Sequence, residues 1–313
     1  MAPTVRVRVA VPVVLMGLAL TAALPGAAHA YVVTYNGFGS PTGISTAGNA
    51  SFTTDGVSAD GTVMNLTPAI GNQAGAAYLT TPVALGSGDT FSTTFQFRFL
   101  NPGGWDPADG ITFVLAQATN GLGSVGNGLG YAGVNNSVAI EFDTYNNTNT
   151  GYPNDTSSNH VAIDTNGVLT DTQLTNAYNN GSCGFTSGGT PNQNSYLAPG
   201  CMSNGDLWTA TIGYNGTDLS VTVQDGSSAP DTLISNYAIN IANDLGASSA
   251  YVGFTGSTGA GWESQNIVNW SFSNTTQLAQ VPEPPGLALF ASGLLALCGL
   301  VTQSRRRARL PRR

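Results

Sequence analysis

Basic residues are almost absent from most of this 313-residue chain. It has no lysine, and its nine arginines are Arg6, Arg8, Arg98 and six within 305–313, so the stretch 31–280 holds only Arg98. The same stretch holds 16 of the 17 acidic residues, which gives it a formal charge of 1 − 16 = −15. A surface of this kind repels phosphate backbones and anionic lipids. We therefore expect no nucleic-acid partner, whereas neutral ligands and divalent cations remain possible.

Histidine and glutamate are also scarce, which limits the catalytic chemistry that the chain can support. Of the two histidines, His29 lies in the N-terminal segment and only His160 lies further on. Between residues 31 and 280 the only glutamates are Glu141 and Glu263. No Ser-His-Asp or Cys-His pairing is legible, so the sequence does not predict an enzyme.

The N-terminal segment differs in composition from the rest of the chain. Residues 1–30 place Arg6 and Arg8 before an apolar run and small residues that end in AHA. This pattern predicts a secretory signal peptide cut after Ala30, in preference to a permanent anchor. In an exported chain, Cys183 and Cys201, which share a Gly/Asn-rich segment, are predicted to form a disulfide.

The C-terminal segment, 279–313, joins a Pro-rich motif (VPEP, 281–284) to an apolar stretch (286–303) and a cluster of arginines. The apolar stretch is long enough for a marginal membrane span, with the arginines on the cytoplasmic side. This order of three parts resembles the PEP-CTERM sorting signal of Gram-negative bacteria. The resemblance implies export, transient membrane anchoring, processing by an exosortase, and a location on the cell surface or in the extracellular matrix.

Short alternating runs separated by Asp-Gly, Asn-Gly and Gly-Ser turns fill the stretch 31–278, and no helical periodicity is evident. Regular short strands with glycine-rich turns predict an all-β antiparallel sandwich, here in one domain. The predicted strands are FSTTFQFRF (91–99), ITFVLA (111–116), SVAIEF (137–142), HVAID (160–164), WTATIGY (208–214), LSVTVQ (219–224), AYVGFT (250–255) and IVNWSF (267–272).

Hard ligands gather in one stretch, EFDTYNNTNTGYPNDTSSNH (141–160). Residues two apart in a strand share a face, so Glu141 and Asp143 lie about 6.6 Å apart on the same side. Two such charges are unfavourable unless a cation lies between them. Oxygen donors suit calcium, and a set that adds an imidazole suits manganese or another transition ion. An ordinary Asn-rich hairpin is the alternative for any single residue of this stretch.

The pattern VAIEFDTYNN…D…NHVAIDTN resembles the metal-binding segment of the legume-type (L-type) lectins. The resemblance implies a jelly-roll β-sandwich of the concanavalin A-like lectin/glucanase architecture. It implies transition-metal ligands at Glu141, Asp143, Asp155 and His160. It implies calcium ligands at Asp143, the Tyr145 carbonyl, the Asn147 side chain and Asp155.

Other segments extend the resemblance to a sugar site. The segment ADG (108–110) implies that Asp109 accepts hydrogen bonds from two sugar hydroxyls after a cis peptide. In GNGLGYAG (126–133) a backbone N–H at Asn127 would reach the same sugar; many members have Gly there, and Asn tolerates positive φ. Residues 256–265 take the place of the variable specificity loop. The implied sugar-binding residues are Asp109, Asn127, Tyr145, Asn147, Gly259, Ala260 and Trp262, and Trp262 either stacks on a second sugar or covers the core.

These features are compatible with three functions. The resemblance favours an exported, calcium-dependent lectin that binds neutral glycans or extracellular polysaccharide. The first alternative is a structural matrix or adhesion protein whose sandwich is only stabilised by metal. A glycoside hydrolase on the same fold is less favoured, because retaining hydrolysis needs a second carboxyl about 5–5.5 Å away. Glucanases on a similar sandwich carry a Glu-x-Asp-x-Glu or Glu-x-Asp-x-x-Glu run. This chain resembles that run only in Glu141 and Asp143, because Thr144, Tyr145 and Asn146 follow in place of the second Glu.

Overall fold

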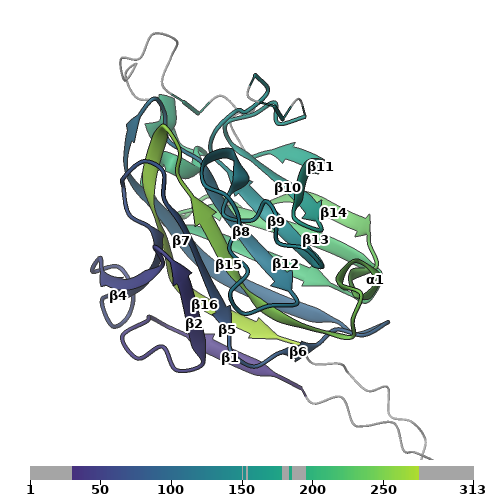
Figure 1. The fold of residues 1–313 in the computed structure, drawn as a ribbon. Coiled ribbons are helices and arrows are strands. Elements are labelled where there is room, and N and C mark those ends of the chain that lie inside the picture. Colours follow the sequence, from purple (N-terminus) through teal and green to yellow (C-terminus); the bar gives the residue numbers. More distant parts are fainter. Residues whose placement is uncertain (1–29, 150, 153, 178–182, 185–194, 275–313) are drawn as a thin grey trace, which may run out of the picture.

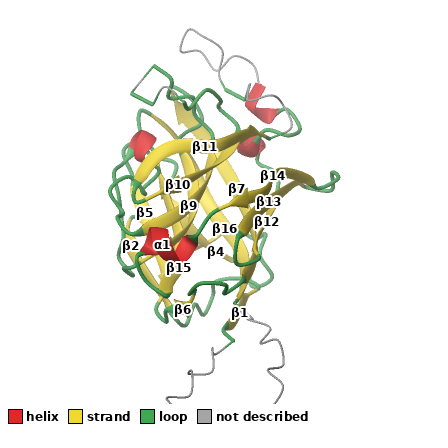
Figure 2. Cartoon of the chain, turned by 90° about the vertical axis from the view of Figure 1, so that its right-hand side faces the viewer, coloured by secondary structure: helices red, strands yellow, loops and turns green. Residues whose placement is uncertain are grey.

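Two antiparallel sheets stacked face to face make up the fold (Figures 1 and 2). The computed structural model describes residues 30–149, 151–152, 154–177, 183–184 and 195–274. Nearly all of the predicted signal peptide and the whole predicted sorting signal lie outside the described residues. Among the described residues, no helix is long and apolar enough to span a membrane.

One sheet, called the rear sheet below, has the order β14-β13-β12-β7-β16-β4-β3, with β1 beside β16. Its strands are β1 (Val32–Tyr35), β3 (Ser51–Thr54), β4 (Thr62–Thr67), β7 (Phe91–Gly104), β12 (Trp208–Tyr214), β13 (Asp218–Asp225), β14 (Asp231–Ala238) and β16 (Gly261–Ser273).

The other sheet, called the front sheet, has the order β11-β10-β9-β8-β15-β5-β2, with β6 beside β15. Its strands are β2 (Ile44–Gly48), β5 (Ala74–Leu79), β6 (Val83–Ala84), β8 (Gly110–Ala116), β9 (Ser137–Asp143), β10 (His160–Thr165), β11 (Val168–Asn176) and β15 (Ser249–Ser257). The described helices are short: α1 (Ile241–Leu245) and the 3-10 turns η1 (Gly126–Gly128), η2 (Ser195–Leu197) and η3 (Met202–Asn204).

All eight predicted strands are confirmed, and the all-β antiparallel sandwich with them. The other eight strands were not predicted from their sequence, β11 and β14 among them. Both are irregular: the pairing of β11 with β10 and that of β14 with β13 contain register shifts. Such bulges disturb the alternation of polar and apolar residues by which a strand is recognised.

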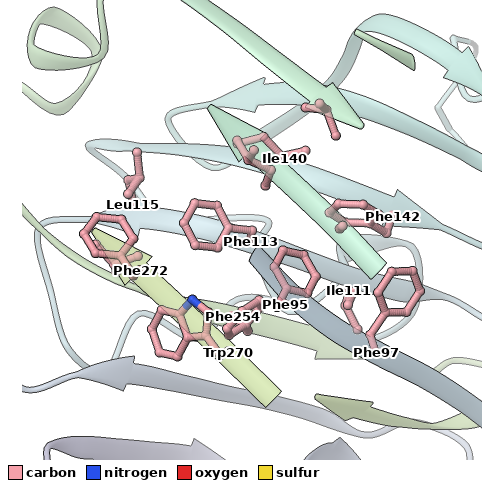
Figure 3. Packing of buried hydrophobic residues seen from close by; sticks show 14 of the residues in the cluster. Phe95, Phe97, Ile111, Phe113, Leu115, Ile140, Phe142, Phe254, Trp270 and Phe272 are labelled. Atoms are coloured by element: carbon pink, nitrogen blue, oxygen red, sulfur yellow. The ribbon is translucent and has the colours of Figure 1, made fainter. Parts of the chain in front are cut away.

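Aromatic side chains from both sheets fill the space between them (Figure 3). The rings of Phe95 and Phe254 lie 4.9 Å apart between centroids, and those of Phe254 and Trp270 lie 5.0 Å apart, both edge to face. Such pairs stabilise a core by about 0.5–1.5 kcal/mol each beyond the area that they bury. The core is therefore held by contacts across the sheets as well as by the strand ladders.

A second, smaller cluster lies on the outer face of the front sheet. This outer cluster consists of Ala76, Tyr78, Val114, Ala116, Tyr131, Val134 and Ala139. Segment 117–136 supplies Tyr131 and Val134, which cover side chains that alternate outward from the strands. As a result, every residue of β8 and of β9 is buried. The candidate site lies on this covered face, at the end of β9.

Candidate functional site

The four predicted transition-metal ligands come together at the end of β9. Glu141 and Asp143 follow Ala139 on the outer face of that strand, and His160 at the start of β10 pairs with Asp143 across the ladder. The Nε2 atom of His160 lies 3.1 Å from Oε1 of Glu141, and its Nδ1 atom lies 3.9 Å from Oδ1 of Asp155. All four residues are at most 3% exposed. The antiparallel pairing of β9 and β10 therefore turns a spacing of twenty residues into a single buried cluster.

The same carboxylates organise the loop that follows β9. Oδ1 of Asp143 accepts a hydrogen bond from the Tyr145 N–H at 2.6 Å. Oδ2 of Asp155 accepts one from the Asn147 N–H at 2.7 Å. The loop that presents Tyr145 and Asn147 is thus held by the predicted calcium ligands themselves.

The electrostatics of the cluster fit a bound cation. Burial, and then the neighbouring carboxylates, raise the pKa values of Glu141 and Asp143 well above their usual range. Burial likewise raises the pKa of Asp155 to about 7, although His160 works against the rise. Oδ1 of Asp155 is buried and has no hydrogen-bond partner. A divalent ion would supply the missing partner and compensate the buried negative charge.

His160 is oriented in the manner of a metal ligand. Its Nδ1 atom lies 2.9 Å from the carbonyl oxygen of Ser157, which can only accept a hydrogen bond, so Nδ1 carries the proton. The Nε2 lone pair then faces the carboxylates. Holding an imidazole through its other nitrogen is the usual arrangement around metal-bound histidine.

Two groups of side chains in the described residues have donor atoms close enough to share an ion. One is Asp143, Asp155 and His160, and the other is Glu141, His160 and Asp171. Asp171 lies on β11 and was not predicted. The signal that could have found it, an aspartate eleven residues after His160, is weak because single aspartates are common in loops and turns.

A shallow depression of about 150 Å³ lies beside the metal cluster. Its lining residues are Trp105, Ala108, Asp109, Gly126, Asn127, Tyr145, Asn147, Gly259, Ala260 and Gly261. Thr144 donates its N–H to the carbonyl oxygen of Asp109 at 2.9 Å, which ties the two halves of the depression together. Six of the seven predicted sugar-binding residues line it, from four separate segments of the chain.

Asp109 follows a cis peptide bond, as the resemblance implied. Burial, and then the nearby charge of Asp155, raise the pKa of Asp109 to about 8. One of its carboxylate oxygens, Oδ2, is buried without a hydrogen-bond partner. The next residue must be glycine: Gly110 has φ 127°, and a Cβ there would lie 2.3 Å from the carbonyl oxygen of Phe142. This close approach brings Asp109 against β9.

The structure adds detail on two of the predicted sugar-binding residues. Asn127 does not have a positive φ; the positive-φ residues of its loop are Gly126, Leu129, Gly130 and Gly133, so Asn127 needs no special tolerance. Trp262 is not among the lining residues. Its indole lies on Gly103 and Gly104, where an added Cβ would come within 2.6 Å of the ring, so it covers backbone. The physical reason is that β16 already begins at Gly261, which turns Trp262 toward β7.

Trp105 is the aromatic residue of the depression that the sequence did not predict. Its backbone N–H donates to the carbonyl oxygen of Ala260 at 3.3 Å, while its side chain is 71% exposed. A large exposed ring beside a depression can stack on the apolar face of a ligand.

Glu263 also lies elsewhere than expected. It belongs to the segment 256–265 that was expected to form the specificity loop, yet it lies in β16, fully buried, where its Oε1 accepts a hydrogen bond from Thr144 Oγ1 at 2.8 Å. Burial raises its pKa to about 8. It is not one of the residues lining the depression, so it supports the loop from below and does not face a ligand.

The predicted disulfide between Cys183 and Cys201 is confirmed, with Cα atoms 5.5 Å apart. The Cys183 N–H donates to Oγ of Ser158 at 3.1 Å. The disulfide therefore joins the metal-binding loop to the segment that precedes β12.

Sequence comparison places these features in a known family. The legume lectin domain matches residues 32–287. A lectin of Leucomphalos mildbraedii is 28% identical over 218 residues, which are 66% of this chain and 79% of the relative. Agglutinin-2 of Cladrastis kentukea is 32% identical over 222 residues, which are 65% of this chain and 66% of the relative.

Solved lectin structures superpose on this chain. A peanut lectin structure with a nine-residue peptide superposes with a TM-score of 0.61 at 25% identity, covering 79% of this chain and 98% of that one. This likeness confirms the jelly-roll sandwich. It also agrees with the expectation that the chain is not an enzyme, since these relatives are lectins. From the match over most of its length, together with the fold, the chain is a member of the legume lectin family.

Proposed function

We propose that this protein is a calcium-dependent lectin that binds neutral glycans in the depression lined by Asp109, Tyr145 and Asn147. The observation that carries the proposal is the direct connection between this depression and the metal cluster. The carboxylates of Asp143 and Asp155 accept hydrogen bonds from the backbone of Tyr145 and Asn147. Side chains that would touch a sugar are thus positioned by groups that would bind the ion.

The residues of the depression suit a sugar chemically. Asp109 has a buried carboxylate oxygen without a hydrogen-bond partner, which can accept from a sugar hydroxyl. Asn147 can donate through its amide nitrogen while its oxygen faces calcium. Tyr145 and Trp105 offer amphipathic rings for the apolar face of a sugar. The near absence of positive charge from residues 31–280 favours neutral glycans over acidic ones.

The donor set supports two ions. Calcium would be held by Asp143, Asp155, the Tyr145 carbonyl and the Asn147 side chain, all oxygen donors. Manganese or another transition ion would be held by Glu141, Asp143, Asp155 and His160, where the imidazole adds a nitrogen. When bound, the ions supply positive charge that keeps the buried carboxylates ionised and the loop ordered.

We further propose that the protein is exported and located on the cell surface or in the extracellular matrix of a Gram-negative bacterium. The support is compositional: the signal-peptide pattern of 1–30 and the three-part tail of 279–313. Processing of that tail by an exosortase, after transient anchoring in the membrane, belongs to the same proposal. Extracellular polysaccharide would then be an accessible ligand.

Glycan-array binding of the purified protein, with calcium and after chelation, tests the function. We expect binding that is lost on chelation and restored by calcium. Asp109→Ala should abolish binding without changing the fold, and Asp231→Ala, on β14 of the rear sheet, is the control. If the folded protein binds no glycan in either condition, the structural matrix role replaces the lectin. Unchanged affinity in Asp109→Ala would rule out this depression as the site.

A further inference from the structure

Asp171 lies on β11 in a conformation that a regular strand does not contain. Its φ is +49°, in the left-handed region, and the pairing of β10 with β11 shifts register between Val161 and Ile163 and again between Ile163 and Thr165. Among the residues of β11, Asp171 is the only buried one. A bulge re-aims a side chain at the edge of a sheet, and here it turns a carboxylate inward from an otherwise exposed strand.

The carboxylate of Asp171 faces the same imidazole nitrogen as Glu141. Its Oδ1 atom lies 3.8 Å from Nε2 of His160, and Oε1 of Glu141 lies 3.1 Å from that atom. Because the proton of the neutral ring is on Nδ1, facing the Ser157 carbonyl, Nε2 presents a lone pair to two carboxylates. Such an arrangement repels itself unless a cation lies between the three groups.

We propose that Asp171 supplies an additional carboxylate ligand to the metal ion held by Glu141 and His160. The donor atoms of these three residues lie within 4.8 Å of one another, as they must to share one ion. A second observation also points to a ligand: Oδ1 of Asp155, on the other side of the imidazole, is buried without a hydrogen-bond partner. The inference rests on the metal part of the proposed function and deepens it.

The charges of the ligands and ions give a physical reason for a carboxylate at Asp171. Glu141, Asp143 and Asp155 carry three negative charges, whereas two divalent ions carry four positive ones. Asp171 brings the ligand set to four negative charges, which matches the charge of two divalent ions and lowers the cost of burying them. An additional carboxylate also makes the site harder, so it favours Mn²⁺ or Mg²⁺ over softer ions.

Manganese binding to the full protein tests the proposal, with the ion itself as the probe. Free Mn²⁺ would be followed by electron paramagnetic resonance in wild type and Asp171→Asn, with calcium present. We expect Asp171→Asn to weaken Mn²⁺ binding about 10- to 100-fold. Water proton relaxation per bound Mn²⁺ should rise, because water replaces the lost carboxylate. Asp231→Asn removes the same charge from the rear sheet and should change neither quantity.

A second variant gives a direct spectroscopic signature in case Asp171→Asn folds poorly. Asp171→Cys loaded with Co²⁺ should show a thiolate-to-cobalt charge-transfer band that wild type lacks. Wild-type binding that is unchanged in Asp171→Asn, or cobalt bound to Asp171→Cys without that band, would overturn the inference and leave the proposed function intact. A wild type that binds neither Mn²⁺ nor Co²⁺ would overturn both the inference and the transition-metal part of the proposed function.

Discussion

The front and rear sheets differ in how many of their faces are buried. Every residue of β8 and β9 in the front sheet is buried, because one face packs on the aromatic core and the other lies beneath the outer cluster and the metal site. In the rear sheet, β12 and β13 alternate between buried and partly exposed residues. Their outward threonines and glutamines meet solvent.

This difference shows how the site is built. Along the outer face of β9, the hydrophobic Ala139 is followed by Glu141 and Asp143. The same row of positions therefore changes from a small apolar cluster to a buried carboxylate cluster. On the rear sheet the corresponding positions hold groups such as Thr94 and Thr211, whose hydroxyls lie 3.2 Å apart in solvent. The pKa values of the carboxylates on β9 are raised well above their usual range because the cover excludes water there.

The largest expected effect on stability is that of removing a side chain from the core between the sheets, compared with removing one from the exposed face of the rear sheet. Phe95→Ala removes a ring from between the sheets and should lower the free energy of unfolding by about 3–5 kcal/mol. Thr211→Ala, on the exposed face of β12, should change it by less than about 0.5 kcal/mol. Urea unfolding with saturating metal measures both. Equal effects of the two substitutions would contradict the comparison.

Metal removal should destabilise the protein through the carboxylate cluster on the covered face of the front sheet. Chelation should lower the free energy of unfolding by about 3 kcal/mol if the metal had been present at about 100 times its dissociation constant. The folded-state pKa values of Asp109 (about 8) and Asp155 (about 7) lie above those of an unfolded chain. The metal-free folded state therefore holds protons that the unfolded state releases, and its stability falls as pH rises from about 4 to 8.

Thermal unfolding of the chelated protein at pH 5 and pH 8 measures this effect, with the higher melting temperature expected at pH 5. The metal-loaded protein serves as the control and should show the opposite order, because protons compete with the ions for the carboxylates. A chelated protein equally stable at both pH values would argue against the buried carboxylates as the cause.

The outer cluster should contribute less than the core, and Tyr131 tests it. The Tyr131 hydroxyl accepts a hydrogen bond from the Gly167 N–H at 3.1 Å. Tyr131→Phe leaves that buried N–H without an acceptor and should cost about 1–3 kcal/mol of unfolding free energy. Tyr237→Phe, on the partly exposed β14, is the matched control, for which less than about 0.5 kcal/mol is expected. A cost for Tyr131→Phe no larger than the control would mean that the cover contributes nothing.

The smallest effect concerns the open rim of the site. Trp105→Ala should weaken glycan binding about 5- to 10-fold, which corresponds to about 1 kcal/mol of ring stacking. Its melting temperature should stay unchanged, because the side chain is 71% exposed. Trp262→Ala should give the reverse, a loss of stability with little loss of affinity, because that ring covers Gly103 and Gly104. Calorimetry with a glycan identified on the array measures affinity for both.

Much of the two-sheet difference is already legible in the sequence. ITFVLA and SVAIEF were grouped with the alternating runs, yet most of their residues are apolar, and they become the doubly buried β8 and β9. WTATIGY and LSVTVQ alternate, and they become half-buried strands of the rear sheet. A strand buried on one face alternates polar and apolar residues, whereas a strand buried on both faces is almost continuously apolar. The fold class and the strands could therefore be predicted.

The metal ligands could be predicted because they are local. Glu141 and His160 belong to neighbouring strands joined by one loop, so a single stretch of chain specifies their meeting. Trp105, Asp171 and Glu263 come from the turn after β7, from β11 and from β16, through contacts distant in sequence. The position of Asp171 depends on a bulge, that of Trp105 on a backbone contact with Ala260, and that of Glu263 on where β16 begins. None of these has a periodic signature.

The sequence by itself determined an all-β chain with a cluster of hard ligands after one buried strand, because periodicity and short-range spacing are properties of the chain alone. Only the tertiary structure decided that Trp105 and not Trp262 lines the depression, and that Asp171 faces His160. Those choices follow from strand register and from which backbone segments approach each other closely. Both are settled only when the two sheets and their outer cover pack together.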